Sequence, residues 1–254
     1  MIVAVLLPLL LTPRAVAQDE AGELSYEGNL SQTANGYVIG KPVTIVHSGG
    51  NLEVRCMDVE KLSARASYAL TGSAEAPMEA YGRGVGLSAT GNATGGTIRT
   101  RVPAKGAGVA TARVEVKVNV PAGASSLTIT QTGSGWTQVI GCGGALKLSS
   151  GKEGLYAGGA YTSVVATASG GDAKVVLDKD VLLTGASTIS APLGSAELVV
   201  AGAQGGKLTA RADEVTVGPL VLGTVTPTLV SGDMGLKGPA ITVTAKTKAT
   251  VRTE

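Results

Sequence analysis

The stretch that decides the fold runs from Leu127 to Leu177 and repeats itself. Its β-prone segments begin 19 and then 18 residues apart, as Leu127-Thr-Ile129, Leu146-Lys-Leu148 and Val164-Val165-Ala166. Each segment is followed by a glycine, at Gly133, Gly151 and Gly170. Small-residue half-turns alternate with the segments, at 141–144, 158–159 and 178–180. Short strands with small corners at a fixed period predict a coiled, parallel β-structure.

The rest of the chain also predicts strands. Val109 to Val120 alternates apolar and polar residues, which gives one buried and one wet face, and Pro121 ends it. No helical pattern of three turns appears after residue 17. We therefore expect an all-β chain, a parallel β-helix or β-solenoid with about 18–19 residues per turn and essentially no helix.

The N-terminus carries a predicted export signal. Residues 2–11 form an apolar stretch too short to span a membrane, and Ala15-Val16-Ala17 matches a cleavage site before Gln18. An uncleaved anchor or a buried strand are the alternatives. Residues 18–36 are polar and predict a partly disordered leader. Residues 37–254 then form a single domain, with irregular strands over 37–121 and repeat rungs plus a C-terminal cap over 122–254.

Charge and composition exclude several classes of protein. Without residues 1–17 the chain has 20 Lys plus Arg against 19 Asp plus Glu, which is no footprint for nucleic acid. No later apolar run reaches 18 residues, so we expect no transmembrane segment in the mature chain. With one Trp, six Tyr and no Phe, the composition favours a thin aliphatic core over a large ligand pocket.

From Val114 through Pro121-Ala122-Gly123 and onward, the chain resembles the adhesin-like β-solenoid domains that bacteria secrete. This family is related to the head domains of autotransporter adhesins. The shared pattern is an alternating strand, a Val-Pro-x-Gly turn, a Leu-x-Ile strand and glycine-cornered rungs such as Ser169-Gly-Gly-Asp172. The resemblance covers residues 40–250 and implies the fold and a surface or periplasmic setting. It implies no catalytic residues.

No catalytic constellation is present. The lone histidine, His47, precedes Ser-Gly-Gly and is predicted to be an exposed turn residue. The S-x-x-K match at 149–152 lies on a repeat corner and lacks its partner motifs. A calcium corner is suggested by 170–172, but the aligned corners carry Ser134 and Lys152. We expect no enzyme activity, no metal and no cofactor.

Two features leave alternatives open. Cys56 and Cys142 could form a disulfide, although Cys142 in a glycine-rich corner favours two unpaired thiols. Trp136 either fills the end of a rung or contacts carbohydrate. The predicted function is a non-enzymatic secreted or cell-envelope protein, structural or adhesin-like, whose partners are cell-surface or envelope components. The alternative is a β-helical enzyme or binding module that acts on envelope polysaccharide.

The predicted oligomeric state is a monomer. The C-terminal segment 241–251 is expected to form the last, edge strand of the stack. Lys246 and Lys248 lie on it at alternate positions. Charged side chains on an edge strand discourage pairing with another chain, so these lysines are expected to act as gatekeepers.

Overall fold

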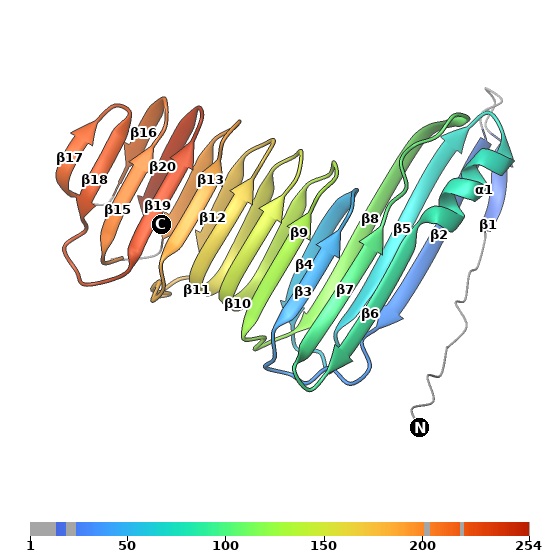
Figure 1. The fold of residues 1–254 in the computed structure, drawn as a ribbon, viewed down its shortest axis with the longest axis horizontal. Coiled ribbons are helices and arrows are strands. Elements are labelled where there is room, and N and C mark those ends of the chain that lie inside the picture. Colours follow the sequence, from blue (N-terminus) through green and yellow to red (C-terminus); the bar gives the residue numbers. More distant parts are fainter. Residues whose placement is uncertain (1–13, 19–23, 201–203, 219–220, 254) are drawn as a thin grey trace.

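The computed structural model describes residues 14–18, 24–200, 204–218 and 221–253, and strands dominate throughout (Figure 1). The expected all-β class is confirmed. The first strands are β1 Arg14–Gln18, β2 Leu24–Thr33, β3 Val43–His47, β4 Asn51–Met57, β5 Ser63–Gly72, β6 Gly86–Asn92, β7 Gly95–Arg101 and β8 Val109–Pro121. The central strands are β9 Ser126–Gln131, β10 Thr137–Ser150, β11 Leu155–Ala168, β12 Ala173–Leu177, β13 Ser187–Ala191 and β14 Ala196–Val200. The last are β15 Lys207–Arg211, β16 Glu214–Val217, β17 Leu222–Thr226, β18 Leu229–Asp233, β19 Ala240–Ala245 and β20 Lys248–Thr253.

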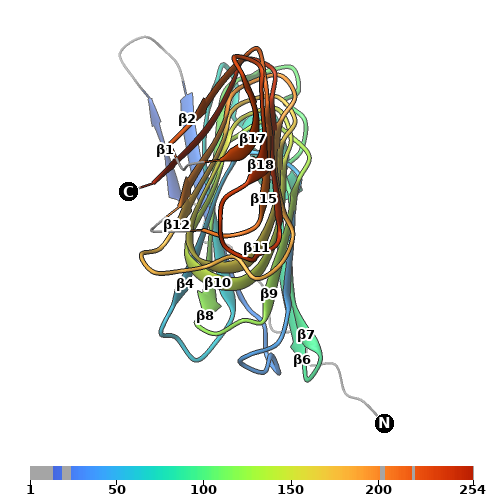
Figure 2. The ribbon, with the colours of Figure 1, turned by 90° about the vertical axis from the view of Figure 1, so that its left-hand side faces the viewer.

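Parallel pairings arrange the central strands in two rows. Row A runs β7, β3, β9, the second half of β10, the second half of β11, β13, β19 and β15. Row B runs β8, β4, the first half of β10, the first half of β11, β12, β14, β20 and β16. Figure 2, which looks along the stack, shows a narrow outline with one row on each long side. The long strands β10 and β11 take part in both rows.

The sequence repeat sets the register of neighbouring strands. Leu127 in β9 lies opposite Leu146 in β10, which lies opposite Val164 in β11. Ile129 and Leu148 are paired in the same way. Equivalent apolar side chains therefore form ladders, and the stacked alignment predicted from the period is confirmed for this stretch.

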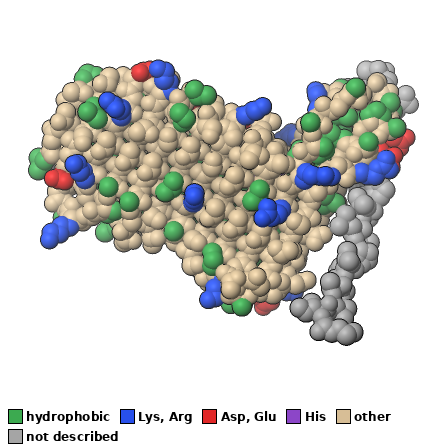
Figure 3. All heavy atoms as spheres, viewed as in Figure 1, with side chains coloured by type: hydrophobic (Ala, Val, Ile, Leu, Met, Phe, Trp, Pro, Cys, Tyr) green, Lys and Arg blue, Asp and Glu red, His purple; other side chains and the backbone are tan. Residues whose placement is uncertain are grey.

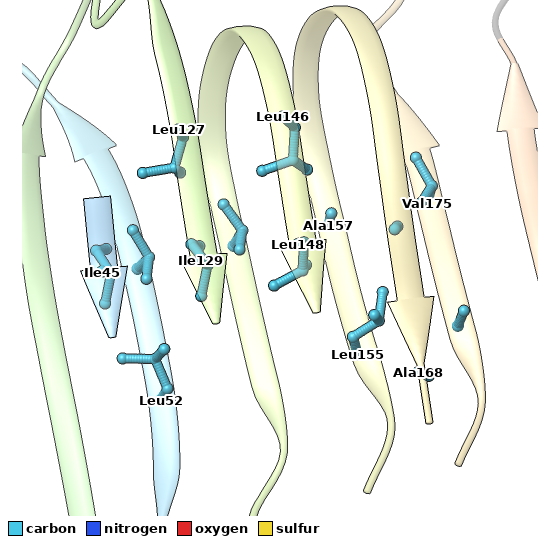
Figure 4. Packing of buried hydrophobic residues seen from close by; sticks show 14 of the residues in the cluster. Ile45, Leu52, Leu127, Ile129, Leu146, Leu148, Leu155, Ala157, Ala168 and Val175 are labelled. Carbon is cyan, nitrogen blue, oxygen red and sulfur yellow. The ribbon is translucent and has the colours of Figure 1, made fainter. Parts of the chain in front are cut away.

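The core lies between the two rows. Strand residues alternate between buried and more exposed positions, as in the Val43–His47 strand β3, because successive side chains in a strand point to opposite faces. Aliphatic side chains from both rows meet in the interior, as the close-up of Figure 4 shows for Ile45, Leu52, Leu148 and their neighbours. Most side chains of this core are Val, Leu, Ile and Ala, so the space between the rows is thin.

Both ends of the sheet depart from a simple parallel coil, and the sheet as a whole is open and mixed. At one end β5 pairs antiparallel with β8 and β2, and β6 pairs antiparallel with β7. At the other end β18 pairs antiparallel with β15 and β17. The fold therefore contains long-range antiparallel pairings that the repeat period does not encode.

The expectation of essentially no helix is wrong at one segment. Helix α1, Glu75–Gly84, packs against β2 and β5 at the N-terminal end of the stack (Figure 1). Pro77 lies in its first turn, where a missing N–H costs no hydrogen bond. Glu79 and Arg83 form an i,i+4 ion pair at 2.8 Å. Within the described residues, no helix is long and apolar enough to cross a membrane.

The C-terminal segment is not an edge. Strand β19 lies between β13 and β15, and β20 lies between β14 and β16. Lys248 begins β20 and pairs with Glu214 of β16, whereas Lys246 pairs with Asp213 at 3.8 Å. The predicted gatekeeper role of Lys246 and Lys248 is therefore wrong, because no free edge runs beside them.

Part of the segment predicted as a partly disordered leader forms a strand. Residues 24–33 form β2, which pairs with β5 along ten residues. Residues 14–18 form β1, which pairs antiparallel with β2. Cleavage after Ala17 would leave only Gln18 of β1, and the apolar stretch 2–11 lies outside the described residues.

The two cysteines form a disulfide, although the sequence analysis favoured two unpaired thiols. Cys56 near the end of β4 is bonded to Cys142 in β10, and their Cα atoms lie 4.8 Å apart. The preceding residue, Gly141, has φ +69°, and the strand pairing shifts its register there. This local bulge interrupts the regular alternation and lets Cys142 approach the neighbouring strand β4.

Candidate functional site

A groove opens on the outer face of row B beside Trp136. Its volume is about 370 Å³ and its lining is mostly apolar. The residues that line it are Trp136, Thr137, Gln138, Gly154, Leu155, Tyr156 and Asp172. They come from three successive levels of the stack, the beginnings of β10, β11 and β12. Trp136, which is 38% exposed, lies on the surface of this groove.

Glycines shape this surface. Thr137 pairs with Leu155, so Trp136 stands next to Gly154 at the adjacent level. A Cβ on Gly154 would lie 2.9 Å from the carbonyl oxygen of Asp172, so glycine lets these two corners of the groove stack closely. The second aromatic residue, Tyr156, lies along the sheet with its hydroxyl over Gly158. Any residue with a Cβ at that position would crowd it, since the Cβ would lie only 2.8 Å from the hydroxyl. The result is a shallow surface with two aromatic side chains on neighbouring strands.

Hydrogen bonds fix the position of Trp136. Its backbone N–H donates to the Asn51 side chain at 3.3 Å, and its carbonyl accepts from the backbone N–H of Leu52 at 2.9 Å. Both partners belong to β4, on the other side of β10 from the groove. The backbone that carries the indole is therefore hydrogen-bonded to β4 on one side, and the next residue, Thr137, donates to the carbonyl of Gly154 on the other.

The charges on either side of the aromatic pair are already paired. Gln138 lies opposite Glu53 on one side, and Tyr156 lies opposite Lys174 on the other. Glu53 forms ion pairs with Arg55 and Lys117. On the other side, Glu197 pairs with Lys174 at 2.9 Å and with Arg252 at 2.7 Å. The aromatic surface thus lies between two ion-pair clusters, each of which holds two cations and one shared carboxylate.

The pKa of Glu197 reflects this pairing. Partial burial by itself favours the protonated form of this carboxyl. The hydrogen bonds and positive charges of Arg252 and Lys174 outweigh that effect and hold the pKa of Glu197 below its usual value. Glu197 therefore remains ionised near neutral pH and pairs with both cations beside the groove.

The only carboxylate that lines the groove is Asp172, and it has a structural partner. Its Oδ1 accepts a hydrogen bond from the backbone N–H of Ser195 at 2.7 Å. This bond joins the corner before β12 to the corner before β14. Among the described residues, no group of three His, Cys, Asp or Glu side chains could hold a metal ion.

His47 is buried and not exposed, so its predicted place in an open turn is wrong. Its Nε2 donates to the carbonyl of Gly50 at 2.9 Å, which leaves Nδ1 to accept from the Thr100 hydroxyl. Gln131 donates to the same Gly50 carbonyl at 2.8 Å. Burial lowers the pKa of His47, although the bond to Gly50 opposes the shift. These side chains hold the turn between β3 and β4 from inside the stack, and none of them lines the Trp136 groove.

Sequence reasoning found Trp136 but missed Tyr156 and Gln138. The repeat contained the signal, because Gln138 and Tyr156 occupy equivalent positions 18 residues apart and pair across β10 and β11. Both follow a buried residue by one position and so must point outward. The S-x-x-K corner at 149–152 contributes no residue to the groove.

Comparison with known proteins gives a limited result. The chain matches no family model and no curated protein. A proposed cell adhesion protein from Clostridium sporogenes is 13% identical with a TM-score of 0.48, covering 90% of this chain and 100% of that one. A proposed adhesin from Bacteroides fragilis is 9% identical with a TM-score of 0.39, covering 89% and 97%. A proposed lipid-binding protein from Parabacteroides distasonis is 12% identical with a TM-score of 0.31, covering 89% and 96%. Likenesses at this level assign neither a family nor a function.

Proposed function

We propose that this protein is a non-enzymatic, adhesin-like protein of the cell envelope or of the secreted fraction, and that it binds neutral polysaccharide through the Trp136 groove. The stacked parallel strands serve as a β-solenoid rod that holds this surface rigid. The observation that carries the proposal is the pair Trp136 and Tyr156 on adjacent strands, at the groove of about 370 Å³.

The chemistry of the groove suits sugar rings. An aromatic face offers apolar area that stacks on the C–H face of a sugar, and Gln138 offers an amide donor and acceptor for hydroxyl groups. Each flanking cation is already ion-paired, Arg55 and Lys117 with Glu53, and Lys174 and Arg252 with Glu197. A neutral chain meets no repulsion here, whereas an anionic polymer would have to compete with Glu53 and Glu197 for these cations.

Binding without cleavage is the favoured reading of the site. Hydrolysis of a glycosidic bond uses two carboxyl groups that flank the scissile bond, about 5–10 Å apart. The lining of the groove contains one carboxylate, Asp172, whose Oδ1 accepts from Ser195 N–H. The arrangement therefore supports a lectin-like contact over the alternative of a β-helical polysaccharide-cleaving enzyme.

Export belongs to the same proposal. The disulfide between Cys56 and Cys142 is the type of bond that persists in oxidising compartments outside the cytosol. We propose that residues 1–17 are removed as a signal peptide and that the mature chain begins at Gln18. Mass spectrometry of the exported protein tests this, and a chain found intact from residue 1 in the cytosol would contradict it.

The binding proposal is tested by fluorescence titration. Trp136 is the only tryptophan, so intrinsic indole fluorescence reports on this groove directly. Neutral envelope glucans, mannans and galactans are titrated against the purified protein, and an anionic polymer such as polygalacturonate serves as comparison. A neutral polysaccharide should shift the emission, and Tyr156→Ala should weaken binding at least about tenfold by removing one stacking partner.

A matched control is available on the opposite row. Val165 in β11 is a similarly exposed apolar side chain, 43% accessible, and Val165→Ala should leave the affinity unchanged. Polysaccharide retained equally by wild type, Trp136→Ala and Tyr156→Ala in a pull-down assay would show that the groove is not the binding site. Release of reducing ends that Asp172→Asn abolishes would establish the enzymatic alternative instead.

A further inference from the structure

The two ends of the stack differ in what packs against their last strands. At the N-terminal end, helix α1 lies over β2 and β5 and buries Met78 and Tyr81 (Figure 1). At the C-terminal end, the hairpin of β17 and β18 lies beside β16 and leaves a groove of about 550 Å³. The groove is lined by Val215, Thr216, Val217, Gly218, Val221, Val225, Thr226 and Val230. One end is thus covered by a helix, whereas the other presents an open valine-lined surface.

Strand β17 is exposed in a way that is unusual for a monomer. Within the described part of the chain, β17 pairs only with β18, which leaves its other edge without a strand partner. All five of its residues are exposed, and Leu222 and Val225 are each 66% accessible. Soluble proteins protect edge strands with charges, prolines or bulges. The sequence Leu-Gly-Thr-Val-Thr of β17 has none of these devices.

We propose that the C-terminal end is the contact surface for a second copy of this chain. Strand β17 pairs antiparallel with β17 of the other copy about a two-fold axis centred on Thr224. Leu222 then lies opposite Thr226, and Gly223 lies opposite Val225. This register contains no charged residue, so no like charges meet across the axis.

The surface itself favours a second copy over an unrelated partner. A two-fold contact uses the same patch on both molecules, so it covers both exposed edges and both valine grooves at once. The charged residues that border β16 are compensated inside the chain, since Asp213 pairs with Lys246 and Glu214 pairs with Lys248. An identical end therefore meets little electrostatic repulsion.

The same geometry limits the assembly to two copies. Continuing growth into a rod would need the C-terminal end of one copy to join the N-terminal end of the next, which is built from different strands, with β1 beside β2 and with α1 packed on β2 and β5. A two-fold contact instead buries the exposed C-terminal end of both molecules, so the dimer has no such end left for a third copy. The expected product is an end-to-end dimer, in contrast to the monomer expected from sequence. The dimer presents two Trp136 grooves, so ligand binding at that surface would become bivalent.

Analytical ultracentrifugation of the purified chain over about 1–100 μM tests the proposal, because an interface of one strand edge and one groove predicts micromolar affinity. We expect a monomer–dimer equilibrium for the wild type. Val225→Lys places a charge on the free edge of each copy and should raise the dissociation constant at least about tenfold. Val165→Lys, at an exposed valine in the middle of row A, should leave it unchanged.

Three results would overturn the proposal. They are a wild type that stays monomeric at the highest concentration, a dimer that survives Val225→Lys, and a distribution that grows beyond dimers with concentration. Circular dichroism of each variant verifies folding. As Val225 is exposed on a strand with no covering layer, a folded Val225→Lys variant is expected. The outcome is independent of the carbohydrate proposal, because the Trp136 groove and this surface share no residue.

Discussion

The disulfide between Cys56 and Cys142 provides the most quantitative prediction. Between the two cysteines the chain forms β5, α1 and β6 at the N-terminal end of the stack, then β7 and β8 at the ends of the two rows, and then β9. The bond closes this segment, with a sequence separation of 86 residues. In the chain-entropy treatment a loop of that length stabilises the folded state by about 4.5 kcal/mol. For a chain of this size, that corresponds to a loss of roughly 10–15 °C in the melting temperature when the bond is removed.

The assay is thermal unfolding followed by circular dichroism, with the double variant Cys56→Ala/Cys142→Ala beside the wild type. Wild type in the presence of a reductant should lose as much stability as the double variant. The reductant should leave the double variant unaffected, which controls for solvent effects. A melting temperature within about 2 °C of the wild type would refute the reasoning, because the segment would then be held by strand pairing alone.

Three further predictions concern single side chains. Because burial lowers the pKa of His47, its neutral form stabilises the fold above about pH 6.5, and this contribution is lost as the pH falls through the depressed pKa. His47→Gln should therefore reduce the pH dependence of the unfolding free energy measured in urea between pH 7 and pH 5. An unchanged pH dependence would count against the buried neutral imidazole. Gly135→Ala should lower the unfolding free energy by more than about 2 kcal/mol in the same assay, since φ there is +114° and a Cβ would lie 2.0 Å from a carbonyl oxygen. Gly123→Ala, at φ +86° in open space, should lower it by about 1 kcal/mol. Equal losses would exclude the clash as the cause. Leu148→Ala should cost about 2–5 kcal/mol by leaving a cavity in the core, and the exposed Val165→Ala less than about 0.5 kcal/mol, so comparable losses would contradict the packing described.

The period of the sequence predicted the stacked alignment, whereas the reason for the recurring glycines comes from the structure. Glycine at a sharp corner commonly supplies a positive φ angle, as Gly141 and Gly144 of the first half-turn do. Gly133, Gly151 and Gly170 have no such angle. Instead, a Cβ on Gly151 would lie 2.6 Å from the carbonyl oxygen of Gly133, and one on Gly170 would lie 2.3 Å from that of Lys152. The glycines recur because successive corners stack closely on one another. The sequence alone does not show which corners become neighbours.

The ends of the fold were mispredicted because their pairings join distant segments. Strand β2 has polar outward residues that resemble a disordered leader, yet Leu24, Tyr26 and Leu30 alternate on the side that faces α1 and the core. The helix was missed because its ten residues span less than three turns and include Pro77. Likewise, Tyr156 became a candidate binding residue only when strand register placed it one level from Trp136. Local composition predicts elements, whereas these features depend on which strands become neighbours.

The order of strands places two early strands and the last two strands of the chain inside the stack. Strands β3 and β4 come early in the chain but lie between β7/β8 and the strands β9/β10, and β19 and β20 come last but lie between β13/β14 and β15/β16. A strand inside the stack is hydrogen-bonded on both edges, whereas an outermost strand has one edge unsatisfied by the sheet. The entropic cost of the longer connections grows only logarithmically with their length, so the additional pairing outweighs it. The outermost positions fall instead to β1 and β6 at one end, where α1 packs on β2 and β5, and to β16 and β17 at the other.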